Sequence, residues 1–372
     1  MRVLYVSDRY CVHDHRFLSA IREAGFETHF LPLSTSAGGD SRPLPEGVVE
    51  HKAVGLPAQA GVLALYRHLP IFQRRLGEVR PDLVHAGPVH RGALMTALSG
   101  FHPLVTMSWG WDLLMAGKAP IQRWLARFTL RRSDAFIGDC QAVRSAAMDL
   151  GMPEGRMAIF PWGVDLERFR PGREPELLAR MGWDDAFVVI TTRAFEPMYD
   201  PETVAEGFIL ASAQAPDLRW LALGEGSLKP RVTERVEAAG LRGRVHFAGS
   251  VGYETLPSYF RAADLYVSAS LVDGSSVSLM EALASGLPAA VSDIPGNREW
   301  VSQGENGWLF PVRDAASLGT LILDARGDAE TRRRMGVTAR RIAEARADWS
   351  VHKAKLREAY AVAIKHVGRR VT

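Results

Sequence analysis

The sequence predicts an α/β protein of two consecutive domains, each with a parallel sheet covered by helices. Three observations support this prediction. The chain has 372 residues, which is about two domains of ordinary size. Short apolar runs without alternation are separated by segments of helical period, a pattern typical of strands buried on both faces. A cluster of proline, glycine and charge at residues 170–176 (RPGREPE) predicts a boundary.

In the first domain, residues 1–170, apolar runs bounded by turn residues predict the strands. They are Val3–Ser7, Thr28–Leu33, Leu83–His85, Leu104–Met107 and Ala135–Ile137. Helical periodicity between these runs predicts the helices Arg16–Ala24, Leu63–Val79 and Gln122–Arg131. The order alternates strand and helix, as a parallel sheet requires.

The second domain, residues 171–352, repeats this organisation. Its predicted strands are Phe187–Thr192, Leu218–Leu223, Val245–Phe247, Leu265–Ser268, Ala289–Ser292 and Trp308–Phe310. Its predicted helices are Glu202–Ala213, Lys229–Ala239, Leu256–Ala262, Ser276–Ser285 and Ala316–Ala325. A terminal helical pattern from Ala343 to Val367 is interrupted near Trp349, so we expect a separate last helix at about 353–372.

Composition excludes several classes of protein. The hydrophobic fraction of 47% and charged fraction of 23% exclude a disordered chain. Two cysteines, without a CxxC pair, exclude a disulfide scaffold and favour a reducing compartment. A net charge of +3 is too weak to indicate nucleic acid binding. No leader or membrane-spanning segment is apparent, so the expected location is cytoplasmic.

The most informative segment is Ser268–Asp293, SASLVDGSSVSLMEALASGLPAAVSD. A strand ends at Ser268, and a helix opens near Ser276 after a turn of small residues. Free N–H groups at such a helix start attract anions. Asp273 precedes Glu281 by eight positions, and the apolar neighbours of Glu281 indicate a buried carboxylate that needs a partner. The alternative is that Asp273 only caps the helix and Glu281 faces solvent.

This segment resembles the signature of family-four glycosyltransferases, which have the retaining GT-B fold. The resemblance extends to GVDLERFRP at residues 163–171, to the region 221–270, and to Trp349 and Tyr360 near the C-terminus. It implies two Rossmann-like domains that face a central cleft, with the C-terminal helix crossing back to the first domain. It also implies transfer of a hexose-type sugar from a nucleoside-diphosphate sugar, UDP more often than GDP, with retention.

The resemblance assigns roles in donor binding to residues of the second domain. Asp273 stands where the family has Glu and would contact the donor sugar, while Arg193 would neutralise the diphosphate; both are candidate catalytic residues. Glu281 would bind the ribose. The remaining donor-binding candidates are Gly274, Ser275, Ser276 and Val277 at the helix start, Tyr199, and Phe247 and Gly249 beside the base.

The sequence departs from the family pattern in three places. Met198 replaces the lysine expected five residues after Arg193, and Tyr199 next to it is a candidate hydrogen-bond donor. Trp109 replaces a common histidine in TMSWGWD. The segment DRYCVHDHRF lacks the usual glycine pair and carries His13 and Asp14 in a loop at the mouth of the first sheet.

The candidate acceptor-binding residues lie in the first domain. They are His13, Asp14, His90, Trp109 and Trp111, and each has a structural alternative as a cap or a core residue. Asp112 is either a site carboxylate or a helix cap. No residues have metal-ligand spacing and no DxD motif occurs in a suitable context, so neither metal nor cofactor is expected beyond the nucleotide-sugar co-substrate.

The predicted function is therefore transfer of a sugar to a hydroxyl of a glycan, a lipid-linked molecule or a natural product. A nucleotide-sugar epimerase on the same scaffold and a degenerate nucleotide-sugar-binding homologue are the alternatives. Two helices that mix arginine with aromatic residues, 67–80 and 122–132, allow weak peripheral contact with an anionic membrane, although a solvated helix face has the same pattern.

Overall fold

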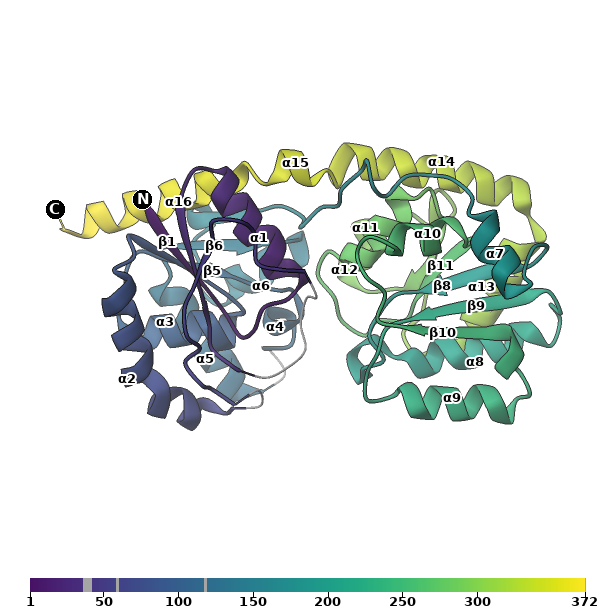
Figure 1. Ribbon diagram of the computed structural model, residues 1–372, viewed down its shortest axis with the longest axis horizontal. Helices are drawn as coiled ribbons and strands as arrows, with labels where there is room; N and C mark the ends of the chain where they lie inside the picture. The colour runs from purple at the N-terminus through teal and green to yellow at the C-terminus, as the bar shows by residue number, and fades with distance from the viewer. Residues whose placement is uncertain (36–41, 58–59, 117–118, 372) are drawn as a thin grey trace. The chain divides into compact units, whose positions relative to one another are not determined.

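The computed structural model describes residues 1–35, 42–57, 60–116 and 119–371. The chain forms two compact units (Figure 1). The first comprises Met1–Pro161 together with Ser350–Thr372, and the second comprises Trp162–Trp349. The C-terminal segment thus returns to the first unit.

The first unit is built on a parallel sheet in the order β3-β2-β1-β4-β5-β6-β7. Its strands are β1 Arg2–Ser7, β2 Glu27–Pro32, β3 Val49–Glu50, β4 Leu83–Ala86, β5 Leu104–Met107, β6 Ala135–Gly138 and β7 Met157–Ile159. The central strands are buried throughout, because helices cover both faces of the sheet.

Alternation along β4 assigns the helices to the two faces. Val84 and Ala86 join a core cluster with α2 (Val62–Val79), α3 (Leu94–Ser99) and α5 (Pro120–Arg132). His85 points the other way and contacts Phe17 of α1 (Val12–Glu23) and Tyr360 of α16 (Lys355–Val371). One layer is therefore α2–α3–α5, and the other contains α1 and α16.

The second unit has a parallel sheet in the order β10-β9-β8-β11-β12-β13. Its strands are β8 Phe187–Thr191, β9 Leu218–Leu223, β10 Val245–Gly249, β11 Leu265–Ser268, β12 Ala289–Ser292 and β13 Gly307–Phe310. Its helices include α7 Pro175–Met181, α8 Pro201–Ser212, α9 Lys229–Ala238, α10 Leu256–Arg261, α11 Val277–Ala284, α12 Pro295–Arg298, α13 Ala315–Gly327 and α14 Ala329–Arg346. The short helix α15, Trp349–His352, begins at the last residue of this unit and continues into the C-terminal segment of the first. Buried clusters lie on both faces of this sheet.

The units divide earlier than the composition break at 170–176. Residues 162–169 belong to the second unit because Trp162, Val164 and Phe169 are buried. The Val164 N–H donates to the Ala347 carbonyl at 2.7 Å, and Phe169 packs edge-on against Phe260. These contacts hold the segment to the second core.

Two strands of the first sheet are additional to the sequence prediction. β3 is exposed and only two residues long, and β7 is half-buried. β3 lacks the apolar run that marks a buried strand. β7 is apolar, Met157–Ile159, but is not among the strands predicted from the sequence. The terminal helical pattern divides into α14, α15 and α16, and α14 begins fourteen residues before the pattern recognised from Ala343.

Candidate functional site

The second sheet has a topological switch point between β8 and β11. From β8 the chain proceeds toward β10 on one side, and from β11 it proceeds toward β13 on the other. Ligands in open α/β folds bind at the carboxyl ends of such strand pairs. Arg193 lies two residues after β8, and Asp273–Ser276 connects β11 to α11. The two segments that the sequence singled out therefore meet at this switch point.

Arg193 is the centre of the site. Its Nη2 forms an ion pair with Asp273 Oδ2 at 2.7 Å, and the two side chains are only 17% and 14% exposed. Its Nη1 donates to Ser276 Oγ at 3.2 Å and to Ser278 Oγ at 3.3 Å. These contacts fix the guanidinium beside the N-terminus of α11.

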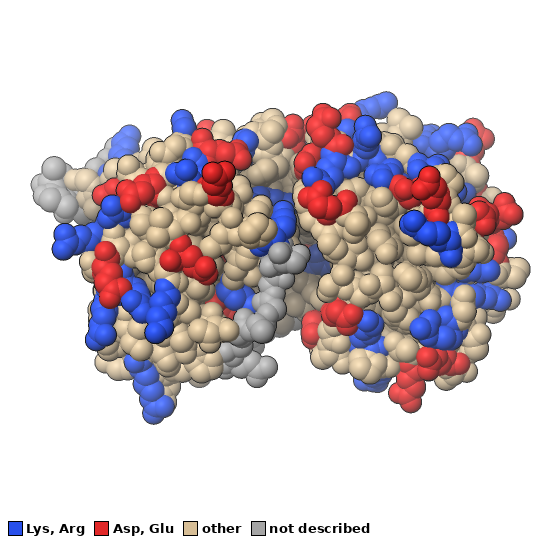
Figure 2. Space-filling view, in the orientation of Figure 1, with Lys and Arg blue, Asp and Glu red and all other residues tan. Residues whose placement is uncertain are grey.

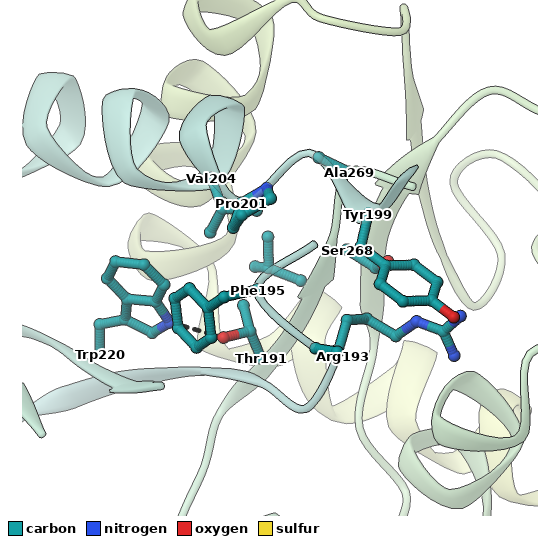
Figure 3. Close-up of a pocket in the computed structure, with 11 residues that line it drawn as sticks. Thr191, Arg193, Phe195, Tyr199, Pro201, Val204, Trp220, Ser268 and Ala269 are labelled. Carbon is teal, nitrogen blue, oxygen red and sulfur yellow. Dashed lines mark hydrogen bonds between the residues drawn. The ribbon is translucent and has the colours of Figure 1, made fainter. Parts of the chain in front are cut away.

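Tyr199 lies against the other side of this guanidinium. The Arg193 guanidinium carbon is 4.0 Å from the ring centroid, a cation–π contact (Figure 3). Tyr199 comes from the short helix η4 (Pro197–Tyr199), and the neighbouring Met198 carbonyl accepts a hydrogen bond from the Leu271 N–H at 2.9 Å. Tyr199, which follows Met198 at the position where the family has lysine, therefore stacks on Arg193.

A narrow pocket extends behind this pair. Its apolar lining includes Phe195 from the segment after β8, Val204 of α8 and Trp220 of β9. It has room for about one water molecule (≈ 10 Å³). Trp220 Nε1 donates to Thr191 Oγ1 at 2.9 Å in its wall (Figure 3). Packed apolar side chains therefore lie next to the segment that carries Arg193.

The start of α11 is held from two directions. Ser276 is the N-cap, and its Oγ accepts a hydrogen bond from the Leu279 N–H at 3.3 Å. Ser275 Oγ accepts a hydrogen bond from Trp300 Nε1 at 3.1 Å, which ties the segment before α11 to the residues that follow α12. A Cβ at Gly296 of α12 would collide with the Asp273 and Gly274 carbonyl oxygens, so only glycine permits this close approach.

Burial and charge act in opposite directions on the central pair. Burial by itself lowers the pKa of Arg193, but Asp273 and other neighbours raise it, and the net direction is upward. Burial raises the pKa of Asp273, opposed by Arg193 and by the Gly274 N–H, which donates to its Oδ1 at 3.0 Å. Arg193 is thus a permanent cation held in a poorly solvated place, where a charge acts strongly on a ligand.

Glu281 lies in α11 and is 6% exposed, so the solvent-facing alternative is wrong. Its charge contributes to raising the pKa of Arg193. Phe247, in the edge strand β10, packs against Phe195 and Trp220. Gly249 ends that strand with φ +69°, and its carbonyl accepts a hydrogen bond from the Gly224 N–H at 2.7 Å. These two residues lie two strands away from β8.

The first sheet has its own switch point, between β1 and β4. Asp8 follows β1, and Arg91 lies in the helical turn η1 (Val89–Ala93) that follows β4. Arg91 Nη2 pairs with Asp8 Oδ1 at 2.5 Å. The ion pair ties together the two chain segments that leave the carboxyl edge at this point.

The predicted acceptor residues form two aromatic pairs at this edge. The rings of His13 and Trp109 lie 5.6 Å apart, and those of His90 and Trp111 lie 5.4 Å apart. All four side chains are half-buried. Within the residues that the structure describes, Trp109 Nε1 is buried without a hydrogen-bond partner.

Asp112 links the segments that carry these two aromatic pairs. Its buried carboxylate accepts hydrogen bonds from the Val89 N–H at 2.7 Å, Ser108 Oγ at 2.7 Å and the Trp109 N–H at 2.9 Å. Burial raises its pKa, and these donors oppose that rise. Asp112 is the second residue of the short helix α4 (Trp111–Leu114), whose N-cap is Gly110, so it is not the cap of that helix. Its carboxylate instead joins the start of η1 to the turn that carries Trp109.

His13 and Asp14 lie in the first turn of α1, which begins at Val12, and not in the loop that the sequence predicted. Asp14 Oδ2 accepts a hydrogen bond from the Cys11 N–H at 2.7 Å and so caps the helix. Its side chain is fully buried, and burial raises its pKa to about 6. Capping is the structural alternative that the sequence allowed for Asp14. The helix start itself was not predicted, because Cys11 is an unusual N-cap residue.

His85, which the sequence placed at the end of β4, is a core residue. Its Nδ1 is 2.9 Å from the Tyr360 hydroxyl of α16, and burial lowers its pKa to about 3. Tyr360 was recognised only by resemblance. Its contact with His85 shows how the last helix attaches to the first sheet.

Metal-binding clusters and membrane-spanning helices are both absent from the part of the chain that the structure describes. Across residues 1–35, 42–57, 60–116 and 119–371, no group of three or more His, Cys, Asp or Glu side chains could hold a metal ion. In the same residues, no helix combines the length and the hydropathy needed to span a bilayer.

Comparisons with known proteins agree with this architecture. Residues 176–342 match the family model described as glycosyl transferases group 1, and residues 12–168 match the model for glycosyltransferase family 4. The structure of Anabaena HepE in complex with UDP and glucose superposes with a TM-score of 0.82, at 19% identity, over 97% of this chain and 99% of that one.

Sequence relatives include two D-inositol 3-phosphate glycosyltransferases. The one from Streptomyces avermitilis is 29% identical over 58% of this chain and 49% of its own length. The one from Pseudarthrobacter chlorophenolicus is 26% identical over 97% of this chain and 92% of its own. The first curated relatives are matched over about half to 60% of their length.

Two Rossmann-like units, with an arginine and a helix N-terminus at a switch point, define a protein of the GT-B class. The predicted fold class is thereby confirmed. The two family models adjoin one another along almost the whole chain. The chain belongs to the group 1, family 4 glycosyltransferases.

Proposed function

We propose that the protein is a retaining glycosyltransferase that moves a hexose-type sugar from a nucleoside-diphosphate sugar to a hydroxyl of an acceptor. The observation that carries the proposal is the arrangement of Arg193, the α11 N-terminus and Glu281 at one strand edge. A cation and free N–H groups suit a diphosphate, and a buried carboxylate one turn further on suits vicinal hydroxyls.

The donor is proposed to carry uridine. HepE, whose fold this chain shares, has been solved with UDP and with UDP-glucose. Arg193 and the Gly274–Val277 backbone would receive the diphosphate, Glu281 the ribose, and Asp273 a hydroxyl of the sugar. Phe247 and Gly249 would lie beside the base. We propose that no metal ion is needed, because Arg193 and the α11 dipole already supply positive charge.

In the proposed reaction the bond between the anomeric carbon and the β-phosphate oxygen breaks. The acceptor oxygen forms its bond to that carbon on the same face, and its proton passes to the leaving phosphate. Arg193 stabilises the negative charge that develops on the diphosphate. His13, His90, Trp109 and Trp111 are the proposed acceptor contacts, and the buried Asp14 orients the first turn of α1.

The test is a thermal-shift screen with UDP-, GDP-, dTDP- and ADP-sugars, followed by incubation with the isotopically labelled sugar that binds. A ligand that binds only the folded protein raises the midpoint of unfolding. We expect the largest rise with a UDP-hexose, unchanged by EDTA, and α-configured product from an α-configured donor. Accumulation of an epimerised nucleotide sugar without any acceptor would identify an epimerase instead. The absence of any stabilisation by all four classes would contradict the proposed donor site.

A further inference from the structure

The first unit has an exposed apolar surface on the α2–α3–α5 layer. Leu63 and Tyr66 of α2 are 63% and 67% exposed, and Ile121 and Trp124 of α5 are 72% and 64% exposed. Tyr66 and Trp124 are the exposed aromatic residues in the part of the chain that the structure describes. We call these four residues the apolar rim.

The apolar rim lies at one edge of the first sheet. α2 follows β3, and α5 follows β5 after the four-residue helix α4 (Trp111–Leu114), so both helices begin on the side of the carboxyl edge of the parallel strands. All four residues lie within the first five positions of their helices. They are therefore at the edge that also carries the two aromatic pairs. Since α3 packs between α2 and α5, the rim belongs to one layer.

Arginine residues continue the outward faces of both helices. On α5, Trp124, Arg127 and Arg131 follow one another at spacings of three and four, so they share a face opposite the buried Leu125 and Thr129. On α2, Leu63, Arg67 and Arg74 share the outward face in the same way. These four arginines are exposed. α5 contains no acidic residue, and Figure 2 shows Lys and Arg side chains over the region where α2 lies in Figure 1.

Trp124 is held in its exposed position by its neighbours. Its ring stacks on Phe128 at a centroid distance of 5.9 Å and an interplanar angle of 20°. The Arg132 guanidinium lies over Phe128, 5.2 Å from the centroid. An exposed tryptophan that is already oriented loses little conformational entropy when it is covered. Tryptophan and tyrosine favour the boundary between headgroups and hydrocarbon.

Arg123 of α5 is exposed as well. We infer that the apolar rim and the arginines Arg67, Arg74, Arg123, Arg127 and Arg131 form a surface that docks on an anionic lipid bilayer. The apolar side chains enter the headgroup boundary and the arginines contact lipid phosphates. Docking in this way places the acceptor edge against the membrane. If the protein docks in this way, the acceptor of the proposed reaction is a hydroxyl of a membrane-embedded amphiphile. This statement about the acceptor rests on the proposed function.

The experiment is vesicle flotation with phosphatidylcholine alone and with added phosphatidylglycerol. We expect binding to the anionic vesicles at low salt and release at about 1 M salt, where the Debye length falls to about 3 Å. Each arginine near an anionic surface is worth roughly fivefold in affinity. Substituting Arg123, Arg127 and Arg131 by Gln should therefore weaken binding by on the order of 100-fold, and Leu63→Ser with Trp124→Ser should abolish it.

The matched control lies in the second unit, where α14 has an exposed Val337 beside exposed Arg333 and Arg341. Val337→Ser with both arginines changed to Gln should bind like the wild type. Equal vesicle binding by all variants, or no binding at low salt, would overturn the inference. So would a wild-type dimer that Leu63→Ser and Trp124→Ser convert to a monomer, because a second copy would then be the occupant.

UDP affinity measured on the same variants separates the two proposals. The surface variants should bind UDP as the wild type does. Vesicle binding without UDP binding would reject the proposed uridine donor and leave the docking surface. UDP binding without vesicle binding would reject the docking surface and leave the proposed donor.

Discussion

The ring of Tyr199 covers one face of the Arg193 guanidinium, whose central carbon lies 4.0 Å from the ring centroid. The sequence made Tyr199 a candidate hydrogen-bond donor beside the position where the family has lysine. The structure instead shows the ring stacked on the cation, and Asp273 paired with the cation's Nη2. The single arginine is thus held in one orientation from two sides.

This stacking predicts the behaviour of Tyr199 variants. Tyr199→Phe keeps the ring and should bind UDP within about twofold of the wild type. Tyr199→Leu removes the cation–π contact, worth about 1 kcal/mol at a partly buried site, and should weaken UDP binding about fivefold. Isothermal titration calorimetry measures both. A loss in Tyr199→Phe as large as in Tyr199→Leu would show that the hydroxyl, and not the ring, contributes.

Substitution of Asp273 should affect UDP binding and donor turnover differently. Asp273→Asn removes a negative charge beside the proposed diphosphate site, so UDP should bind at least as tightly as before. The same change removes the proposed contact to the sugar, so turnover of the donor should fall about tenfold or more. Release of UDP from the donor measures turnover. Asp293→Asn, which changes an aspartate that pairs with Arg298 at the surface, is the control and should alter neither quantity.

His85 predicts a dependence of stability on acid. Burial lowers its pKa to about 3 in the folded protein, below the ordinary 6.5. The resulting stability is present above pH 6.5 and is lost as the pH falls toward 3. Between pH 7 and pH 5 the loss is about 2 kcal/mol. Urea unfolding of His85→Gln at both values should show the difference from wild type shrinking by that amount; a constant difference would contradict the burial effect.

Asp14 predicts the opposite pH dependence. Its pKa rises from 3.8 to about 6 on burial, so the folded protein is favoured by the neutral carboxyl below pH 3.8 and loses that advantage as the pH rises through 6. Asp14→Asn keeps an acceptor for the Cys11 N–H and carries no charge. It should raise the free energy of unfolding by about 3 kcal/mol at pH 8 and by little at pH 4. Destabilisation at pH 8 would show that the carboxylate charge is itself needed.

Much of the fold could be predicted from the sequence because its central strands are buried on both faces. Apolar runs such as Leu104–Met107 and Leu218–Leu223 coincide with strands of the structure. β3 could not be predicted, because Val49 and Glu50 are exposed and paired with one neighbour only. Such a strand depends on the edge of the sheet, which a local pattern does not reveal.

The candidate site residues could be chosen from the sequence, but the contacts between them could not be predicted from it. Arg193 and Asp273 were found as parts of motifs eighty residues apart, and the order of the strands brings them together. The stacking of Tyr199 and the hydrogen bonds of Asp112 to Val89 and Trp109 depend on side-chain positions set by tertiary packing. The burial of Asp14 and Asp112 likewise becomes apparent only in the folded structure.

The most direct test is the affinity for UDP, by calorimetry, of the wild type, Arg193→Gln and Glu281→Gln. Arg193 and Glu281 lie at the same strand edge and are proposed to hold the diphosphate and the ribose of one ligand. Loss of a hydrogen bond to a charged group is worth about 1.5–3 kcal/mol, so each variant should bind UDP on the order of 10- to 100-fold more weakly. Wild-type affinity in both variants, with the fold intact by circular dichroism, would contradict the assignment of this edge to the nucleotide sugar.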